Sequence, residues 1–291
     1  MIEGSIVALV TPMREDGSID YEALARLIDF HASEGSKALV IAGTSGEAST
    51  LTFDEHSELI AFAVRAADGR LPIIGGTGSN NTAEAIELTA AAARAGVAAC
   101  LLVAPYYVKP TQEGLYRHHR RVAEAVDIPQ ILYNVPGRTA VDLHDDTVVR
   151  LAAVDRIVGL KDATGDIPRL RALLPRLPAD FPVYSGDDAT TRAALLAGAR
   201  GAISVTANVA PAAMAAMCEV AMAGDAPRAA ELDAPLAGLH RTLFLETNPI
   251  PVKWAVHRLG LIGQTLRLPL TPLSESCRAP LEQAMQTAGV L

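Results

Sequence analysis

Lysine is scarce in this chain, since only four of its 25 basic residues are lysines. Lys161 directly follows the apolar run Ile-Val-Gly-Leu at residues 157–160. At the C-terminal end of a barrel strand it would lie on the catalytic face of an α/β barrel. A lysine amine among apolar walls favours its neutral form, which can attack a carbonyl carbon and give a Schiff base. The alternative is a packed lysine stem whose charged head reaches solvent and pairs with Asp162. Position alone leaves both interpretations open.

A second apolar run ends in a glycine- and hydroxyl-rich turn. Residues 43–47 read Gly-Thr-Ser-Gly-Glu. Glycines let backbone amides approach a ligand closely, and the hydroxyls of Thr44 and Ser45 add donors, a combination that suits a small carboxylate. An ordinary strand-to-helix turn has the same composition, so the motif is weak by itself.

A third run ends in a tyrosine that an arginine soon follows. Residues 133–139 read Tyr-Asn-Val-Pro-Gly-Arg-Thr. A tyrosine at a strand end, here Tyr133, can carry a proton, and Arg138 can hold a carboxylate through a bidentate fork. The plain alternative is a core tyrosine and a solvated arginine.

These residues need a scaffold that brings strand ends together, and the apolar pattern predicts one. Short apolar runs recur, most of them continuous rather than alternating, as in parallel strands covered on both faces. Capping boxes, formed by Thr52 with Glu55 and by Asn81 with Glu84, predict the starts of two intervening helices. The pattern predicts a (β/α)8 TIM barrel, with a doubly wound sheet as the alternative. The eight predicted strands are residues 6–10, 38–42, 73–76, 99–104, 129–134, 157–161, 182–185 and 201–204.

Helical pattern continues beyond the eighth strand, over residues 211–223, 226–245, 249–261 and 275–288. A barrel needs only one of these helices. We therefore expect a catalytic barrel domain over residues 1–224 and a small, docked C-terminal helical domain over residues 225–291. Lys253 is expected on one of the C-terminal helices.

Composition excludes several classes of function. The net charge is −8 and half of the 291 residues are hydrophobic, which favours a large core and argues against binding to nucleic acid or anionic membranes. The three cysteines are widely spaced, so neither a disulfide scaffold nor a cysteine zinc site is expected. The first 14 residues do not resemble a signal peptide, and no apolar run is long enough for a transmembrane helix, so a cytoplasmic protein is expected. No P-loop, dinucleotide-binding, zinc-protease or α/β-hydrolase motif occurs.

Taken together, the motifs resemble the dihydrodipicolinate synthase family of pyruvate-dependent class I aldolases, to which N-acetylneuraminate lyase is related. The resemblance covers essentially the whole chain. The Asn-Val-Pro-Gly-Arg-Thr motif is its most specific element, because sugar-acid lyases usually differ there. The matching segments are residues 4–12, 43–47, 104–107, 133–139, 159–162, 185–188 and 248–253.

The resemblance implies condensation of pyruvate with L-aspartate 4-semialdehyde in the biosynthesis of lysine and diaminopimelate, with no metal or organic cofactor. Lys161 would form the Schiff base with pyruvate. Tyr133, Thr44 and Tyr107 would form a proton relay, in which Tyr107 reaches across from a neighbouring subunit.

The resemblance also implies how the substrates are held. Thr44 and Ser45 would bind the pyruvate carboxylate, and Arg138 the carboxylate of the semialdehyde. Gly186 would line the pocket, and Ile203 would contribute a backbone carbonyl.

Assembly and regulation are implied as well. The family precedent is a homotetramer built as a dimer of dimers, with L-lysine as an inhibitor bound at the tight dimer interface. The positions that match the lysine site are His56, Asn80, Glu84 and Tyr106, although Glu84 is also explained by helix capping. Ala48 and Ser49 are assigned to the same site, but here and at Phe53 the chain departs from lysine-sensitive relatives, which often have a serine, an alanine and a histidine at these three positions.

Two rival functions remain. One is a related aldolase or lyase that acts on a sugar-acid aldehyde, against which Arg138 argues. The other is a non-catalytic sensor that binds a keto acid on the same fold, which the retained lysine, tyrosines and hydroxyls disfavour.

Overall fold

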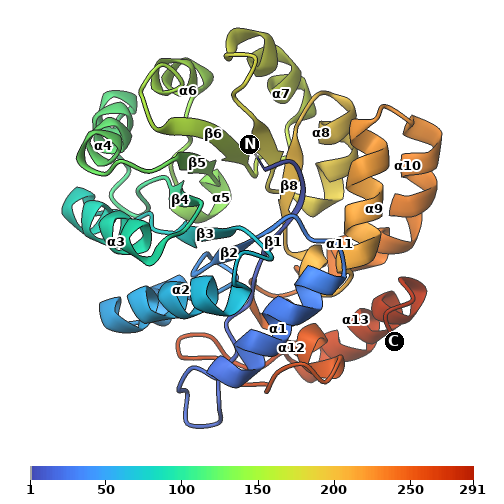
Figure 1. Ribbon diagram of the computed structural model, residues 1–291. Helices are drawn as coiled ribbons and strands as arrows, with labels where there is room; N and C mark the ends of the chain where they lie inside the picture. The colour runs from blue at the N-terminus through green and yellow to red at the C-terminus, as the bar shows by residue number, and fades with distance from the viewer. Residues whose placement is uncertain (1) are drawn as a thin grey trace.

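The computed structural model describes residues 2–291 as a closed barrel of eight parallel strands, with helices around it (Figure 1). Each strand pairs with the next, and β1 pairs with β8, so the doubly wound alternative is wrong. All eight predicted strands are confirmed, with small differences at their ends. The strands are β1 (Gly4–Ala8), β2 (Ala38–Ile41), β3 (Ile73–Gly76), β4 (Ala99–Val103), β5 (Gln130–Asn134), β6 (Ile157–Asp162), β7 (Val183–Ser185) and β8 (Gly201–Ser204).

Helices alternate with these strands. The first nine are α1 (Tyr21–Ser33), α2 (Phe53–Ala67), α3 (Thr82–Ala95), α4 (Gln112–Ala125), α5 (Pro136–Thr139), α6 (Asp145–Leu151), α7 (Ile167–Leu173), α8 (Thr191–Leu196) and α9 (Pro211–Met222). Four more follow the barrel: α10 (Ala226–Asp233), α11 (Ala237–Thr242), α12 (Ile250–Arg258) and α13 (Glu275–Thr287).

The strands are buried on both faces, which explains their continuous apolar sequence. One face packs inside the barrel and the other against the helices. The barrel closes where β1 pairs with β8, and the two strands approach closely there, because a Cβ on Gly201 would lie 2.5 Å from the carbonyl oxygen of Gly4. The interior cluster consists of Ile6, Ala8, Ala38, Val40, Ile74, Ala99, Leu101, Ile131, Tyr133, Val135, Tyr184 and Ile203.

One predicted capping box is confirmed and the other is wrong. Thr52 and Glu55 exchange their hydrogen bonds at the start of α2. At the start of α3, Asn81 accepts from a backbone amide, but the Glu84 carboxylate accepts instead from the Ser79 hydroxyl at 2.8 Å. A hydroxyl two residues before the helix cap thus replaces the backbone amide as the partner of Glu84.

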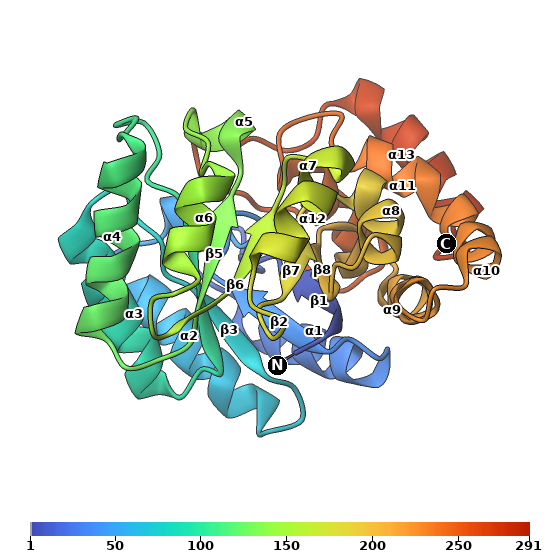
Figure 2. The same cartoon turned by 90° about the horizontal axis from the view of Figure 1, so that it is seen from above.

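The C-terminal helices pack on one side of the barrel, where α10 contacts α8 and α9 (Figure 2). The helix expected over residues 226–245 is interrupted by a 3-10 turn, Ala234–Leu236, between α10 and α11. Pro235 lies inside this turn and has no backbone N–H to continue the α-helical ladder. The domain boundary at residue 225 stays a prediction.

Across residues 2–291, no helix combines the length and the apolar character that crossing a bilayer requires. The three cysteines are free thiols, and two of them, Cys100 and Cys218, are buried.

Candidate active site

Lys161 and Tyr133 lie next to each other at the C-terminal ends of β6 and β5. They are register partners, and the Lys161 Nζ lies 4.2 Å from the centre of the Tyr133 ring. Both side chains are buried, with Lys161 only 5% exposed. The side-chain hydrogen bonds of Asp162 come from Asn134 and Thr164, so the alternative in which the lysine head pairs with Asp162 is wrong. Among residues 2–291 the Lys161 amine has no hydrogen-bond partner, so its lone pair or protons are available to a ligand.

Gly186 borders the lysine side chain. A Cβ at this position would lie 2.8 Å from Lys161 Cε and 2.9 Å from the Cβ of Ala163. Its amide donates to the Asp162 carbonyl at 2.7 Å, which fixes the β7 end against β6. Only glycine leaves the lysine stem its observed place. Ile203 lies on β8 inside the barrel and is buried.

The polar turn after β2 is held from two sides. Thr11 donates its hydroxyl proton to the Gly46 carbonyl at 2.7 Å, and Asn248 Nδ2 donates to Ser45 Oγ at 3.0 Å. Ser45 is buried, whereas Thr44 is half-buried. The turn therefore has a fixed backbone, and Thr44 retains access to solvent.

Arg138 lies on the short helix α5, just beyond the end of β5, and is exposed. Its Nη2 donates to the backbone carbonyl of Asn248 at 3.3 Å. Asn248 therefore contacts both Ser45, through its side chain, and Arg138, through its backbone. Its signal in the sequence was the Asn-Pro-Ile-Pro segment, but no role could be assigned to it from spacing.

Tyr107 is 84% exposed and has a φ of +70°. Its backbone amide donates to the carbonyl of Thr139 at 3.3 Å, so the segment lies beside α5. Tyr106 and Val108 are exposed as well. Within a single chain, the structure does not bring the Tyr107 ring into contact with Lys161 or Tyr133.

Polar side chains hold the ends of β5 and β6 from outside the barrel. Asn134 and Asp162 are register partners one residue after the lysine pair, and Asn134 Nδ2 donates to Asp162 Oδ1 at 3.2 Å. The same amide donates to Asp142, which also accepts two bonds from Arg169. Burial raises the pKa of the Asp162 carboxyl, although hydrogen bonds from Thr164 and Asn134 act in the opposite direction. This network fixes the strand register at the lysine.

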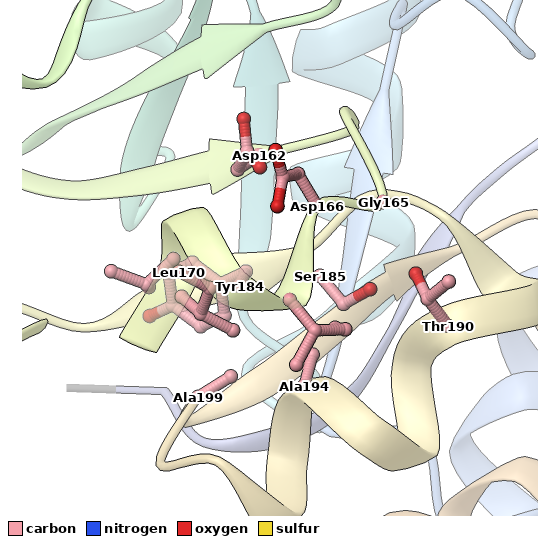
Figure 3. Close-up of a pocket in the computed structure, with 11 residues that line it drawn as sticks. Asp162, Gly165, Asp166, Leu170, Tyr184, Ser185, Thr190, Ala194 and Ala199 are labelled. Carbon is pink, nitrogen blue, oxygen red and sulfur yellow. The ribbon is translucent and has the colours of Figure 1, made fainter. Parts of the chain in front are cut away.

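A pocket lies behind this network, between β6, β7 and the helices α7 and α8 (Figure 3). Asp162 and Ser185 line it and are register partners. Because side chains alternate along a strand, they face away from the barrel interior, where Lys161 lies. The pocket is therefore separate from the lysine site.

The six positions assigned to a lysine-binding site lie near the start of α2, the start of α3 and the end of β4. His56 is buried, its Nε2 bonds to the Gly76 carbonyl at 2.8 Å, and burial lowers its pKa. Asn80 and Glu84 are half-buried, and Tyr106 is exposed. Ala48 and Ser49 belong to a 3-10 turn, Ala48–Thr50. Their role as a ligand site stays a prediction.

A buried lysine beside a tyrosine at the C-terminal end of a parallel barrel is an arrangement that can support Schiff-base chemistry, as in class I aldolases. The dihydrodipicolinate synthetase family model matches residues 1–288. The chain therefore belongs to the dihydrodipicolinate synthetase family, and it is an enzyme of the lyase class.

Individual relatives agree over the full length. The chain is 60% identical to a 4-hydroxy-tetrahydrodipicolinate synthase from Thioalkalivibrio sulfidiphilus, over 100% of this chain and 99% of the relative. It is 58% identical to the enzyme of that name from Stutzerimonas stutzeri, with both chains fully covered.

Solved structures match as well. The chloride-inhibited dihydrodipicolinate synthase from Acinetobacter baumannii, complexed with pyruvate, has a TM-score of 0.99 and 56% identity, with 100% of both chains covered. The enzyme from Cyanidioschyzon merolae, with lysine bound, has a TM-score of 0.96 and 39% identity, covering 100% of this chain and 99% of that one.

Proposed function

We propose that this enzyme is a 4-hydroxy-tetrahydrodipicolinate synthase that joins pyruvate to L-aspartate 4-semialdehyde through a Schiff base on Lys161. The observation that carries the proposal is the buried Lys161 amine, 4.2 Å from the Tyr133 ring centre at the catalytic end of the barrel. Sequence identities of 60% and 58% to synthases of that name, over the full length of this chain, support the choice of substrates.

The chemistry begins with attack of the neutral Lys161 amine on C2 of pyruvate. Loss of water gives an iminium ion, and loss of a proton from the methyl carbon gives an enamine. The Tyr133 hydroxyl accepts and returns these protons, together with Thr44 and Tyr107 of a neighbouring subunit. The enamine carbon then attacks the aldehyde carbon of the semialdehyde, whose oxygen takes up a proton. Finally, the amino group of the semialdehyde displaces the lysine amine by transimination, which closes the ring and frees Lys161.

Substrate binding divides between two carboxylate sites. Thr44 and Ser45 hold the pyruvate carboxylate, while Gly186 and the Ile203 carbonyl complete the pocket. Arg138 holds the carboxylate of the semialdehyde; its exposed side chain and its contact to Asn248 suit this role. A charge-assisted fork of this kind orients a planar carboxylate.

A condensation assay on the purified protein tests the proposal. Pyruvate with L-aspartate 4-semialdehyde is expected to give turnover, and pyruvate with a sugar aldehyde is expected to give little. The opposite preference would identify the rival sugar-acid aldolase. A protein that binds pyruvate but turns over neither aldehyde would be the rival sensor.

We further propose that the enzyme works as a homotetramer, a dimer of dimers. The 84% exposure of Tyr107 supports this, because a large aromatic side chain is costly to leave in solvent and gains by packing on a partner. Sedimentation of the active enzyme tests the assembly, and a fully active monomer would refute it.

Inhibition by L-lysine is the regulatory part of the proposal. A lysine complex exists for the Cyanidioschyzon merolae relative. Here the ligand would lie against His56, Asn80, Glu84, Tyr106 and the Ala48–Ser49 turn at the dimer interface. An activity titration with L-lysine at limiting pyruvate, repeated on Glu84→Ala, tests it. A flat titration up to high millimolar lysine would end this part alone.

Cellular location and domain division complete the proposal. Three free thiols fit a reducing cytoplasm, where we place the enzyme. We assign catalysis to the barrel domain, residues 1–224, and a supporting role to the C-terminal helical domain, residues 225–291.

A further inference from the structure

The turn that carries Thr44 and Ser45 ends in a glutamate, Glu47, which is buried and adopts a positive φ of +56°. Its carboxylate oxygens each have a donor. Lys253 Nζ donates to Oε1 at 2.6 Å, and the backbone amide of Arg267 donates to Oε2 at 3.1 Å. Each oxygen of the Glu47 carboxylate therefore accepts a hydrogen bond from the protein itself.

Lys253 is equally enclosed. The side chains of Lys253 and Glu47 are both 0% exposed, and the lysine amine also donates to the Thr265 carbonyl at 2.6 Å. Burial lowers the pKa of Lys253, and the charge of Glu47 opposes that shift. A buried ion pair gains stability when additional hydrogen bonds satisfy its partners, and here Thr265 provides a second acceptor for Lys253 while Arg267 provides a second donor for Glu47.

All of these partners come from the C-terminal part of the chain, as does Asn248, which bonds Ser45 at 3.0 Å. Residues 248–267 thus hold the turn at two points, Ser45 and Glu47. From the opposite side, Thr11 bonds the Gly46 carbonyl, and a Cβ on Gly46 would lie 3.2 Å from three different atoms. The turn has little freedom to move between these contacts.

The Thr44 hydroxyl, in contrast, makes no hydrogen bond to any residue in the described range 2–291. Thr44 is tied only through its backbone, whose carbonyl accepts from the Glu47 amide at 3.2 Å. The backbone that carries the Thr44 hydroxyl is therefore linked directly to Glu47.

We infer that Lys253, through its buried pair with Glu47, is a positioning residue that presents Thr44 and Ser45 to the carboxylate of the keto-acid substrate. The inference rests on the proposed function, since it takes pyruvate as the ligand of this turn. It gives the C-terminal helices a part in substrate binding, although no reacting group lies on them.

The test variant is the double substitution Glu47→Gln with Lys253→Met. Removing one partner alone would leave an uncompensated buried charge and destabilise the fold, whereas neutral residues of similar volume at both positions are often tolerated. The measurement is reductive trapping at Lys161 with borohydride over a range of pyruvate concentrations, with the site mapped by mass spectrometry.

The half-saturating pyruvate concentration is expected to rise by about tenfold or more, since a charge-assisted hydrogen bond is lost from good geometry. The trapping rate at saturating pyruvate is expected to stay within about threefold, because a loss of ground-state binding is overcome by concentration. Trapping of acetone, a ketone without a carboxylate, is expected to be unchanged.

The control is Asp233→Asn, which weakens a partly buried ion pair with Arg192 and a hydrogen bond with His240, away from this turn. Its half-saturating pyruvate concentration is expected to equal that of the unsubstituted enzyme. Should the double variant not fold, Asn248→Ala replaces it, with an expected rise of about threefold from the loss of one neutral hydrogen bond to Ser45.

Two outcomes would overturn the inference. In the first, the double variant has the same half-saturating pyruvate concentration as the unsubstituted enzyme. In the second, pyruvate and acetone trapping fall together, which is the mark of a general structural role. If the unsubstituted enzyme gives no pyruvate adduct, the proposed function fails and takes the inference with it. If the enzyme forms the pyruvate adduct but the variants keep the same dependence on pyruvate concentration, the inference fails and the proposed function stands.

Discussion

Tyr133 and Lys161 are register partners on adjacent strands, and the lysine amine faces the tyrosine ring at 4.2 Å from its centre. The strand pairing itself thus creates the contact. One residue further along, Asn134 and Asp162 form the matching outward pair. A slip of one residue in this register would break both pairs.

Replacing Tyr133 with phenylalanine keeps the ring beside Lys161 and removes only the hydroxyl. We expect turnover to fall by about 10²–10⁴-fold, the usual effect of losing a general acid–base group. The control is Tyr184→Phe, at the other register partner of Lys161. The Tyr184 hydroxyl donates to the Ile2 carbonyl and so points to the opposite end of the barrel. Equal losses in both variants would contradict a proton-carrying role for Tyr133.

Substitution of Arg138 by alanine should separate the two substrates. Loss of a bidentate carboxylate contact, worth about 1.5–3 kcal/mol, predicts at least a tenfold lower kcat/KM for the semialdehyde. The pyruvate adduct at Lys161 should form as before, because the Arg138 side chain donates to the backbone carbonyl of Asn248 and does not contact the lysine. Steady-state kinetics with each substrate varied in turn measures both effects. Collapse of adduct formation with unchanged semialdehyde kinetics would reassign the residue.

A methyl group added at Gly186 should displace the lysine stem. The new Cβ would lie 2.8 Å from Lys161 Cε and 2.9 Å from Ala163 Cβ, closer than packed carbons allow. Gly186→Ala is therefore expected to slow pyruvate trapping by at least tenfold while the enzyme stays folded. The control is Gly137→Ala, where an added Cβ meets nothing within 4 Å. Unaltered trapping in Gly186→Ala would show that the lysine does not need its observed position.

Buried histidines should make the fold sensitive to mild acid. Burial lowers the pKa of His31 and His118 to about 4 and that of His119 to about 3. In the unfolded chain these groups titrate near 6.5, so between pH 6.5 and 4 the unfolded state binds more protons than the folded state. The free energy of unfolding therefore decreases as the pH is lowered through this window, by up to about 1.4 kcal/mol per pH unit for each histidine.

Denaturant unfolding at a series of pH values measures this slope. His119→Leu is expected to flatten it, since His119 is buried and neither ring nitrogen has a partner among the described residues. His144→Gln, at an exposed position, serves as the control and should leave the slope unaltered. A slope that is the same in all three proteins would contradict the account of the buried imidazoles.

The sequence predicted the barrel because each strand is buried on both faces and so carries a continuous apolar run. The strand-end residues Lys161, Tyr133, Thr44 and Ser45 could be named in advance because parallel strands deliver their C-terminal ends to one face. Their roles as a set stay predictions. What the sequence could not predict depends on partners that are distant along the chain. The Glu47–Lys253 pair joins residues 206 positions apart, and no spacing rule connects them.

Local competition explains the wrong predictions. Glu84 has the spacing of a capping box with Asn81, but the Ser79 hydroxyl is its partner. The helix over residues 226–245 has the right periodicity, yet Pro235 interrupts it with a 3-10 turn. In the first place a hydroxyl offers the carboxylate another partner, and in the second a proline removes a backbone donor, and periodicity reveals neither.

The central claim is that Lys161 forms the Schiff base, and borohydride reduction in the presence of pyruvate tests it most directly. The predicted result is one pyruvate-derived adduct per chain, mapped to Lys161 by mass spectrometry and absent in Lys161→Arg, whose guanidinium stays protonated and cannot attack a carbonyl. Adduct formation at Lys37, Lys109 or Lys253 in place of Lys161, or no adduct in the unsubstituted enzyme, would contradict the account.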